Sequence, residues 1–188
     1  MSPMPTATPM TAQEYLACHH HDGLRSELID GEVVVNEPCL RHQAVCDELQ
    51  FALTSWTRAA AGRGFAVRPL DVLLDELNVF APDVLWYAEG RVPPRTDPRP
   101  YPMPDLAVEV RSPSTWRYDV GAKKSGYERH GLPELWLVDL AAAEVLIFRR
   151  AGRRSAGFDV ALELARGDEL ASPMLPGFSL PLRALFDG

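Results

Sequence analysis

Apolar residues recur at helical spacing in two long segments of the chain. The clearer one predicts a helix over 42–61 that ends at Gly62, with apolar residues at these positions: Val45, Leu49, Leu53, Trp56 and Ala60. A second helix is predicted over 118–130, closed by Gly131 and Pro133. A short helix over 11–18 has Thr11 as N-cap, and Glu14 completes a capping box.

Shorter apolar or alternating runs predict strands between these helices. Asp30-Gly31 separates two such runs and is typical of a type I′ hairpin turn near the N-terminus. The predicted strands cover 25–29, 32–36, 65–68, 71–75, 84–87, 106–110, 135–139, 145–149 and 158–164, and the tail is predicted to be irregular. Mixed strands with two principal helices indicate an α/β or α+β fold with an antiparallel component.

Proline content marks the irregular parts of the chain. Six of the 17 prolines fall between Pro93 and Pro104, so this stretch is neither a helix nor a central strand, and it is predicted to be a loop. Residues 1–10 are rich in proline and threonine and are interpreted as a disordered arm without the features of a secretory signal. Residues 11–188 are predicted to form a single domain.

Composition narrows the class of protein. The chain is 46% hydrophobic and 24% charged, and no apolar run approaches the roughly 18 residues of a membrane span. Three cysteines without a CxxC pattern fit a reducing cytoplasm. The run Cys18-His19-His20-His21 resembles a metal-binding tract, but consecutive side chains cannot all face one ion. P-loop, Rossmann, α/β-hydrolase and zincin motifs are absent from the sequence.

Charge is distributed unevenly. The net charge of -7 argues against a non-specific nucleic-acid coat, yet residues 111–154 carry nine basic and five acidic groups. A polyanion would meet this segment first. Alternatively, its arginines only flank a solvated hairpin turn at Ala151-Gly152.

Four carboxylates lie at or beside apolar strands: Glu27, Asp83, Asp105 and Glu109. Burial of an unpaired charge is costly, and a divalent cation such as Mg²⁺ is one way to compensate it. Asp105 and Glu109 lie four residues apart on one strand, roughly 13 Å between Cα atoms, which is too far for one small ion. Asp83 opens another strand that the fold can bring beside Glu109, so this pair is favoured as the metal ligands.

The helix over 118–130 carries Lys123, with Asp119 and Tyr127 on the same face. Seventeen of the 19 basic residues are arginine, and the only two lysines are Lys123 and Lys124. One interpretation is an exposed Asp119–Lys123 pair. The other is a catalytic ammonium, because lysine is a compact donor that arginine cannot replace. Lys124 is turned about 100° away and is expected to be solvated.

Several motifs together resemble the Uma2 (DUF820) family, which is placed among the PD-(D/E)xK, restriction-endonuclease-like nucleases. The resemblance covers about residues 10–187 and rests on order and spacing rather than on one motif. The motifs are Glu27-Leu-Ile-Asp-Gly-Glu32, His42, Pro82-Asp83-Val84, Pro104-Asp-Leu-Ala-Val-Glu109-Val-Arg-Ser-Pro-Ser-Thr115, Asp119-x-x-x-Lys123-x-x-x-Tyr127, Gly131-Leu-Pro-Glu-Leu-Trp-Leu-Val-Asp139 and Ser172-Pro-Met-Leu-Pro-Gly-Phe.

The resemblance implies a mixed β-sheet core flanked by helices, and a Mg²⁺ or Mn²⁺ ion held by Asp83 and Glu109. It also implies that the catalytic lysine has moved to the helix, as Lys123, and that Glu27 is a further catalytic acid. His42 matches a family histidine, although it could simply bond to the loop before its helix. Tyr127 matches the helix motif and is expected, like His42, to face the substrate.

Arg111 departs from the family pattern, since the standard motif has lysine two residues after the acid and related sequences usually have an apolar residue there. Strand alternation places Arg111 on the same face as Glu109. Arg111 could bind a substrate phosphate bidentately, or it could neutralise Glu109 and compete with the metal.

The resulting hypothesis is a metal-dependent endonuclease that acts on nucleic acid, with DNA favoured, in the cytoplasm and possibly as a homodimer. Two other classes stay open. One is a nuclease-like fold that binds nucleic acid or a protein without cutting. The other is an assembly protein whose carboxylates are paired internally.

Overall fold

The computed structural model describes residues 8–18, 25–152 and 154–187, and its centre is a six-stranded mixed sheet with strand order β10-β9-β8-β7-β6-β3. The central strands β7 (Leu106–Val110) and β8 (Glu134–Asp139) are parallel, and all other neighbours are antiparallel. The remaining strands are β3 (Phe65–Val67), β6 (Val84–Tyr87), β9 (Glu144–Arg149) and β10 (Val160–Ala165).

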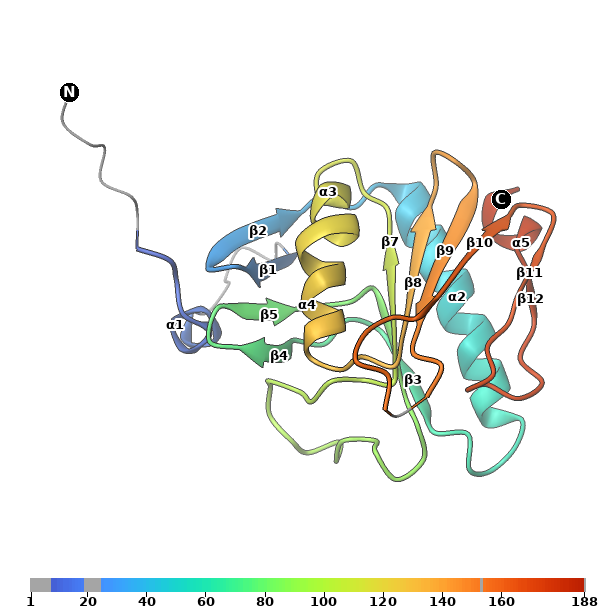
Figure 1. Cartoon of the computed structure of the whole chain (residues 1–188), viewed down its shortest axis with the longest axis horizontal. Helices are drawn as coiled ribbons and strands as arrows, with labels where there is room; N and C mark the ends of the chain where they lie inside the picture. Colours follow the sequence, from blue (N-terminus) through green and yellow to red (C-terminus); the bar gives the residue numbers. More distant parts are fainter. Residues whose placement is uncertain (1–7, 19–24, 153, 188) are drawn as a thin grey trace.

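A helical crossover joins β7 to β8, as a parallel pair requires. It begins as α3 (Trp116–Tyr118), passes through a π-helical turn η1 (Asp119–Lys123) and continues as α4 (Lys124–Arg129). Figure 1 shows α3 and α4 as one continuous helix beside the sheet.

The two principal helices cover opposite faces of the sheet. Alternate residues of β7, namely Leu106, Val108 and Val110, pack with the apolar stripe of α2 (Leu40–Arg58). The intervening Ala107 packs with Tyr127 of α4. All five residues of β7 and all six of β8 are buried, so the polar residue Glu109 lies inside the molecule.

A second, antiparallel sheet with order β2-β1-β5-β4 lies beside the crossover helix (Figure 1). Its strands are β1 (Arg25–Ile29), β2 (Glu32–Asn36), β4 (Val72–Asp75) and β5 (Asn78–Phe80), and α1 (Ala12–Ala17) packs against it. Asp30 and Gly31 both have positive φ, as the predicted hairpin turn requires. This sheet carries Glu27 to the main sheet.

The predicted fold class is confirmed: a mixed sheet with flanking helices and an N-terminal hairpin. The capping box of Thr11 and Glu14 is also present. Helix α2 begins at Leu40, two residues earlier than predicted, and ends at Arg58. The irregular tail was wrong in part, because β11 (Glu169–Leu170), β12 (Leu180–Pro181) and α5 (Arg183–Phe186) form there.

The proposed disordered arm and the cysteine–histidine run fall largely outside the described residues. At the end of the arm, the backbone N–H of Met10 donates to the carbonyl of Gly31. Within the described ranges, no helix has the length and apolar character needed to cross a membrane.

Candidate active site

Adjacent strands bring the two predicted metal ligands together. Strands β6 and β7 pair with Val84 opposite Val108, and continuing this register by one residue places Asp83 beside Glu109. The backbone N–H of Val110 donates to Asp83 Oδ2 at 2.7 Å. Both residues are buried, with only 2% of their surface exposed. Their proximity depends on the antiparallel pairing and not on their separation in sequence.

Three groups surround the Asp83 carboxylate. Arg25 Nη1 donates to Oδ1 at 2.6 Å, and Val110 and His42 Nε2, the latter at 3.3 Å, approach Oδ2. Burial opposes ionisation of Asp83, but His42, Arg25 and the Val110 N–H together hold the pKa of Asp83 well below its usual range. Asp83 is therefore an anion.

Lys123 lies at the centre of three carboxylates. Its Nζ is 2.8 Å from Glu109 Oε1, 2.9 Å from Glu27 Oε1 and 3.2 Å from Asp119 Oδ1. Tyr127 donates its hydroxyl to Glu109 Oε1 at 2.6 Å. Lys123 is 1% exposed, so the exposed Asp119–Lys123 pair considered as an alternative is wrong.

The π-helical turn places Asp119 and Lys123 in this cluster. The backbone N–H of Lys124 donates to the carbonyl of Asp119, five residues earlier, which widens the helix by one residue. Both Asp119 and Lys123 are buried on the inner side of the turn. Such turns are rare and are found frequently at functional sites.

These residues form what we call the buried charge cluster, with more negative than positive charge. Its members are Arg25, Glu27, Asp83, Glu109, Asp119 and Lys123. Four carboxylates face two permanent cations, and such an imbalance favours retained protons or an added cation.

The pKa shifts of the cluster have this common origin. Burial raises the pKa of Glu109 to about 8 despite Lys123, and burial likewise raises the pKa of Asp119 to about 6. Burial alone would lower the pKa of Lys123, but the carboxylates around it raise that pKa well above its ordinary value. The lysine is therefore a fixed ammonium.

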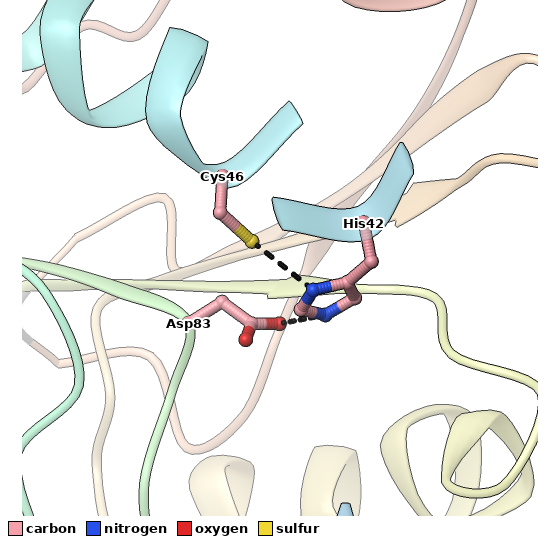
Figure 2. Close-up of side chains that lie close together, drawn as sticks. All are labelled: His42, Cys46 and Asp83. Atoms are coloured by element: carbon pink, nitrogen blue, oxygen red, sulfur yellow. Dashed lines mark hydrogen bonds and ion pairs between the residues drawn. The ribbon is translucent and has the colours of Figure 1, made fainter. Parts of the chain in front are cut away.

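Figure 2 shows a second arrangement at Asp83, in which His42 lies between Cys46 and Asp83. Cys46 Sγ is 3.6 Å from His42 Nδ1, on the ring edge away from the aspartate. A cysteine, a histidine and an acid in line resemble a nucleophilic triad. However, Cys46 is fully buried, and burial raises the pKa of its thiol, so it is not an activated nucleophile.

The donor set fits a divalent cation. Two buried polar atoms at the cluster, Asp119 Oδ1 and His42 Nε2, make no hydrogen bond within the described part of the chain and have only their ion-pair contacts with Lys123 and Asp83. The ligand atoms of His42, Cys46 and Asp83 also lie within 4.8 Å of one another. Carboxylate oxygens suit Mg²⁺ and Mn²⁺, whereas a thiolate would favour a softer ion.

Arg111 lies away from Glu109. Its Nη1 donates to both carboxylate oxygens of Asp139 at 2.8 Å, and its guanidinium lies over the ring of Trp116. Glu109 is instead held by Lys123 and Tyr127. The internal neutralisation of Glu109 that the sequence left open thus comes from Lys123 and not from Arg111.

Asp105, which the sequence offered as a further carboxylate, and Lys124, the second lysine, lie outside the cluster. Asp105 accepts hydrogen bonds from Arg91 and from the backbone of Ala88. Lys124 Nζ lies 4.5 Å from the ring centroid of Phe148.

Sequence reasoning missed Arg25 as a member of the cluster. Its only sequence signal is its place two residues before Glu27, on the same face of one strand. Cys46 lies four residues after His42 on α2, a spacing that could have shown their contact.

Comparison with known proteins identifies the family and agrees with the fold. The model of the Uma2 family, described as "Putative restriction endonuclease", matches residues 12–183, so the chain belongs to the Uma2 family. A crystal structure from Anabaena variabilis, titled a "putative nuclease belonging to DUF820", is similar with a TM-score of 0.78 at 19% identity. The similarity covers 95% of this chain and 98% of that one and concerns the fold. No curated protein matches the chain.

Proposed function

We propose that this protein is a divalent-metal-dependent endonuclease whose substrate is nucleic acid, with DNA as the favoured form. The single observation that carries the proposal is the buried charge cluster, in which four carboxylates face two permanent cations. Such an excess of buried negative charge needs compensation, either by protons held on the carboxylates, as the raised pKa of Glu109 indicates, or by an added cation. The family description and the nuclease-like fold support the same class.

Asp83 and Glu109 would hold the ion, which we propose to be Mg²⁺ or Mn²⁺. When bound, such an ion polarises a phosphodiester oxygen and makes a bound water a stronger nucleophile. Glu27 and Asp119 would act by fixing Lys123 through their ion pairs with its ammonium. The Lys123 ammonium would stabilise the negative charge that develops on the phosphate.

The remaining candidates have supporting roles in this proposal. His42 holds Asp83 from α2, and Tyr127 orients Glu109 through its hydroxyl. Arg111 is 35% exposed beyond the end of β7, where it could contact a backbone phosphate while Asp139 fixes its direction. We also propose a homodimer in the cytoplasm, since the acidic chain would need a second copy to complete a cleft for DNA.

A catalytically silent binding module is the second candidate. The observation that favours it is closure of the site: the carboxylates of Asp83 and Glu109 are 3% exposed, and both oxygens of Asp83 contact protein groups. A binding module would need no metal, whereas the nuclease must open this cluster to admit one.

Cleavage of supercoiled plasmid in Mg²⁺, Mn²⁺ or EDTA separates the two candidates. We expect nicking with either metal, none in EDTA, and at least about a hundredfold loss in Asp83→Ala and Glu109→Gln. Asp105→Asn is the matched control, because it removes a buried carboxylate outside the cluster and should retain activity. Wild-type rates in the Asp83→Ala variant would overturn the proposal.

A further inference from the structure

Arg25 is the one member of the buried charge cluster with substantial contact with solvent. Its side chain is 22% exposed, whereas the carboxylates and Lys123 are each at most 3% exposed. It enters the cluster from β1 and reaches Asp83, which directly precedes β6 of the other sheet. Arg25 is therefore the member of the cluster that solvent contacts most.

A surface pocket of about 230 Å³ lies beside Arg25. Ala81, which is two residues before Asp83, is part of its wall, and Arg99 and Asp71 lie there too. Arg99 is held by Asp71 at 2.8 Å, so Arg25 is the cation of this wall that connects the pocket to the cluster.

Arg25 uses only part of its hydrogen-bonding capacity. Nη1 donates to Asp83 Oδ1 and Nη2 to the carbonyl of Ala81. Nε is buried and has no partner within the described residues. A guanidinium offers five donors in a fork that suits phosphate, so this one is incompletely satisfied.

Arg25 also holds the oxygen that a metal would need. Asp83 Oδ2 already accepts from Val110 and faces His42, which leaves Oδ1 as the oxygen for a cation. In this structure Oδ1 accepts the hydrogen bond from Arg25. A guanidinium and a divalent ion compete for it. A displaced Arg25 then needs another anion, because most of its side chain is still buried and a largely buried cation without a partner is costly.

We propose that Arg25 is an exchangeable cation, paired with Asp83 in the metal-free protein and transferred to a backbone phosphate of the nucleic acid in this pocket when metal binds. The inference rests on the proposed function. Metal binding frees Arg25 from Asp83, and the phosphate gives the freed Arg25 a new anionic partner. Each ligand therefore strengthens binding of the other, and such coupling is reciprocal.

The test is titration of Mn²⁺ into the folded full-length protein, with free Mn²⁺ measured by electron paramagnetic resonance. The wild type is titrated alone, with a thymidine dinucleotide joined by a charged phosphorothioate, and with its uncharged methylphosphonate analogue. Arg25→Gln and the control Arg99→Gln, on the same pocket wall, are titrated in the same way.

We expect Arg25→Gln to bind Mn²⁺ at least about tenfold more tightly than wild type, since a competing charge-assisted hydrogen bond is gone. Arg99→Gln should stay within about threefold of wild type, which excludes a general effect of lost positive charge. The charged dinucleotide should tighten Mn²⁺ binding to wild type at least about threefold, but not binding to Arg25→Gln. The uncharged analogue should have no effect.

Equal or weaker Mn²⁺ binding by a folded Arg25→Gln protein would overturn the inference. If that variant does not fold, the wild type decides alone, because absence of coupling between Mn²⁺ and the charged dinucleotide contradicts the exchange. If the wild type binds Mn²⁺ and cleaves plasmid, but neither the Arg25→Gln change nor the charged dinucleotide tightens Mn²⁺ binding, only the role of Arg25 is refuted. Absence of Mn²⁺ binding in every variant would refute the proposed function as well.

Discussion

Residue 123 is a lysine, although 17 of the 19 basic residues of the chain are arginine. The reason is geometric. Three separate carboxylates approach Nζ within 3.2 Å, and a compact ammonium can donate to all three. A planar guanidinium directs its donors into one fork and is larger, so it would not fit the same position.

Replacement of Lys123 by methionine should reveal this role, because it leaves the carboxylates without their central cation. We expect Lys123→Met to lower the free energy of unfolding by about 3–5 kcal/mol, measured by urea denaturation. Lys124→Met removes the neighbouring lysine, which lies over Phe148, and should cost at most about 1 kcal/mol. Adding Glu27→Gln to Lys123→Met should recover part of the loss, and equal losses for the two single lysine variants would contradict the account.

Asp139 should make stability depend on pH. Burial opposes its ionisation, but Arg111 and the N–H groups of Ala141 and Ala142 lower the pKa of Asp139 below its ordinary value of 3.8. A lowered folded-state pKa contributes stability above about pH 4, and this contribution is lost as the pH falls through the folded-state pKa.

We therefore expect Asp139→Asn to be about 1–2 kcal/mol less stable than wild type at pH 7. The difference should shrink as the pH is lowered from 4 to 2, when wild-type Asp139 is protonated. Chemical denaturation at pH 7, 4 and 2 measures both quantities. A difference that stays constant over this range would show that the charge of Asp139 does not matter.

At the scale of the elements, the apolar periodicity predicted the helices and strands that are long or fully buried. Helix α2 and strands β1, β2, β6 and β7 follow directly from apolar spacing and from the Asp30-Gly31 turn. The short strand β5 was missed because three residues carry too little pattern. The π-helical turn was missed because its stability depends on the contacts of Asp119 and Lys123 with other elements.

The residues of the candidate site likewise fall into those that the sequence predicted and one that it did not. Strand position and the family resemblance singled out Asp83, Glu109 and Lys123, and the structure brings these three into one cluster. Arg25 was not predicted as a member. Its contact with Asp83 joins residues 58 apart, one on β1 and the other just before β6 of the other sheet, and local sequence does not encode that contact.

Packing of α4 against β5 gives an element-scale prediction. A Cβ added at Gly126 would lie 2.8 Å from Cε2 of Phe80, which is fully buried and in edge contact with Tyr127. We expect Gly126→Ala to lower the free energy of unfolding by about 1–3 kcal/mol through this overpacking. Gly121→Ala is the matched control, since open space surrounds it and alanine should be neutral or stabilising. Thermal denaturation of both variants measures the contrast, and equal melting temperatures would contradict it.

At the scale of the whole molecule, the fold alters the meaning of the basic segment 111–154. Much of its positive charge is used internally: Arg111 pairs with Asp139, Lys123 is buried, and Arg150 donates to three backbone carbonyls. The segment therefore presents less positive charge to a polyanion than its net count of +4 indicates. In the proposed nuclease, recognition of nucleic acid would then depend on local contacts close to the cluster rather than on a broad basic surface.

The central claim is that the carboxylates of Asp83 and Glu109 hold a divalent cation inside this fold. Anomalous diffraction from crystals soaked in Mn²⁺ tests it most directly, with Glu109→Gln crystals as the control. We predict one strong anomalous peak between the two carboxylates in wild type and its loss in the variant. A peak elsewhere, such as between Cys46 and His42, or no peak in crystals of the active protein, would contradict the claim.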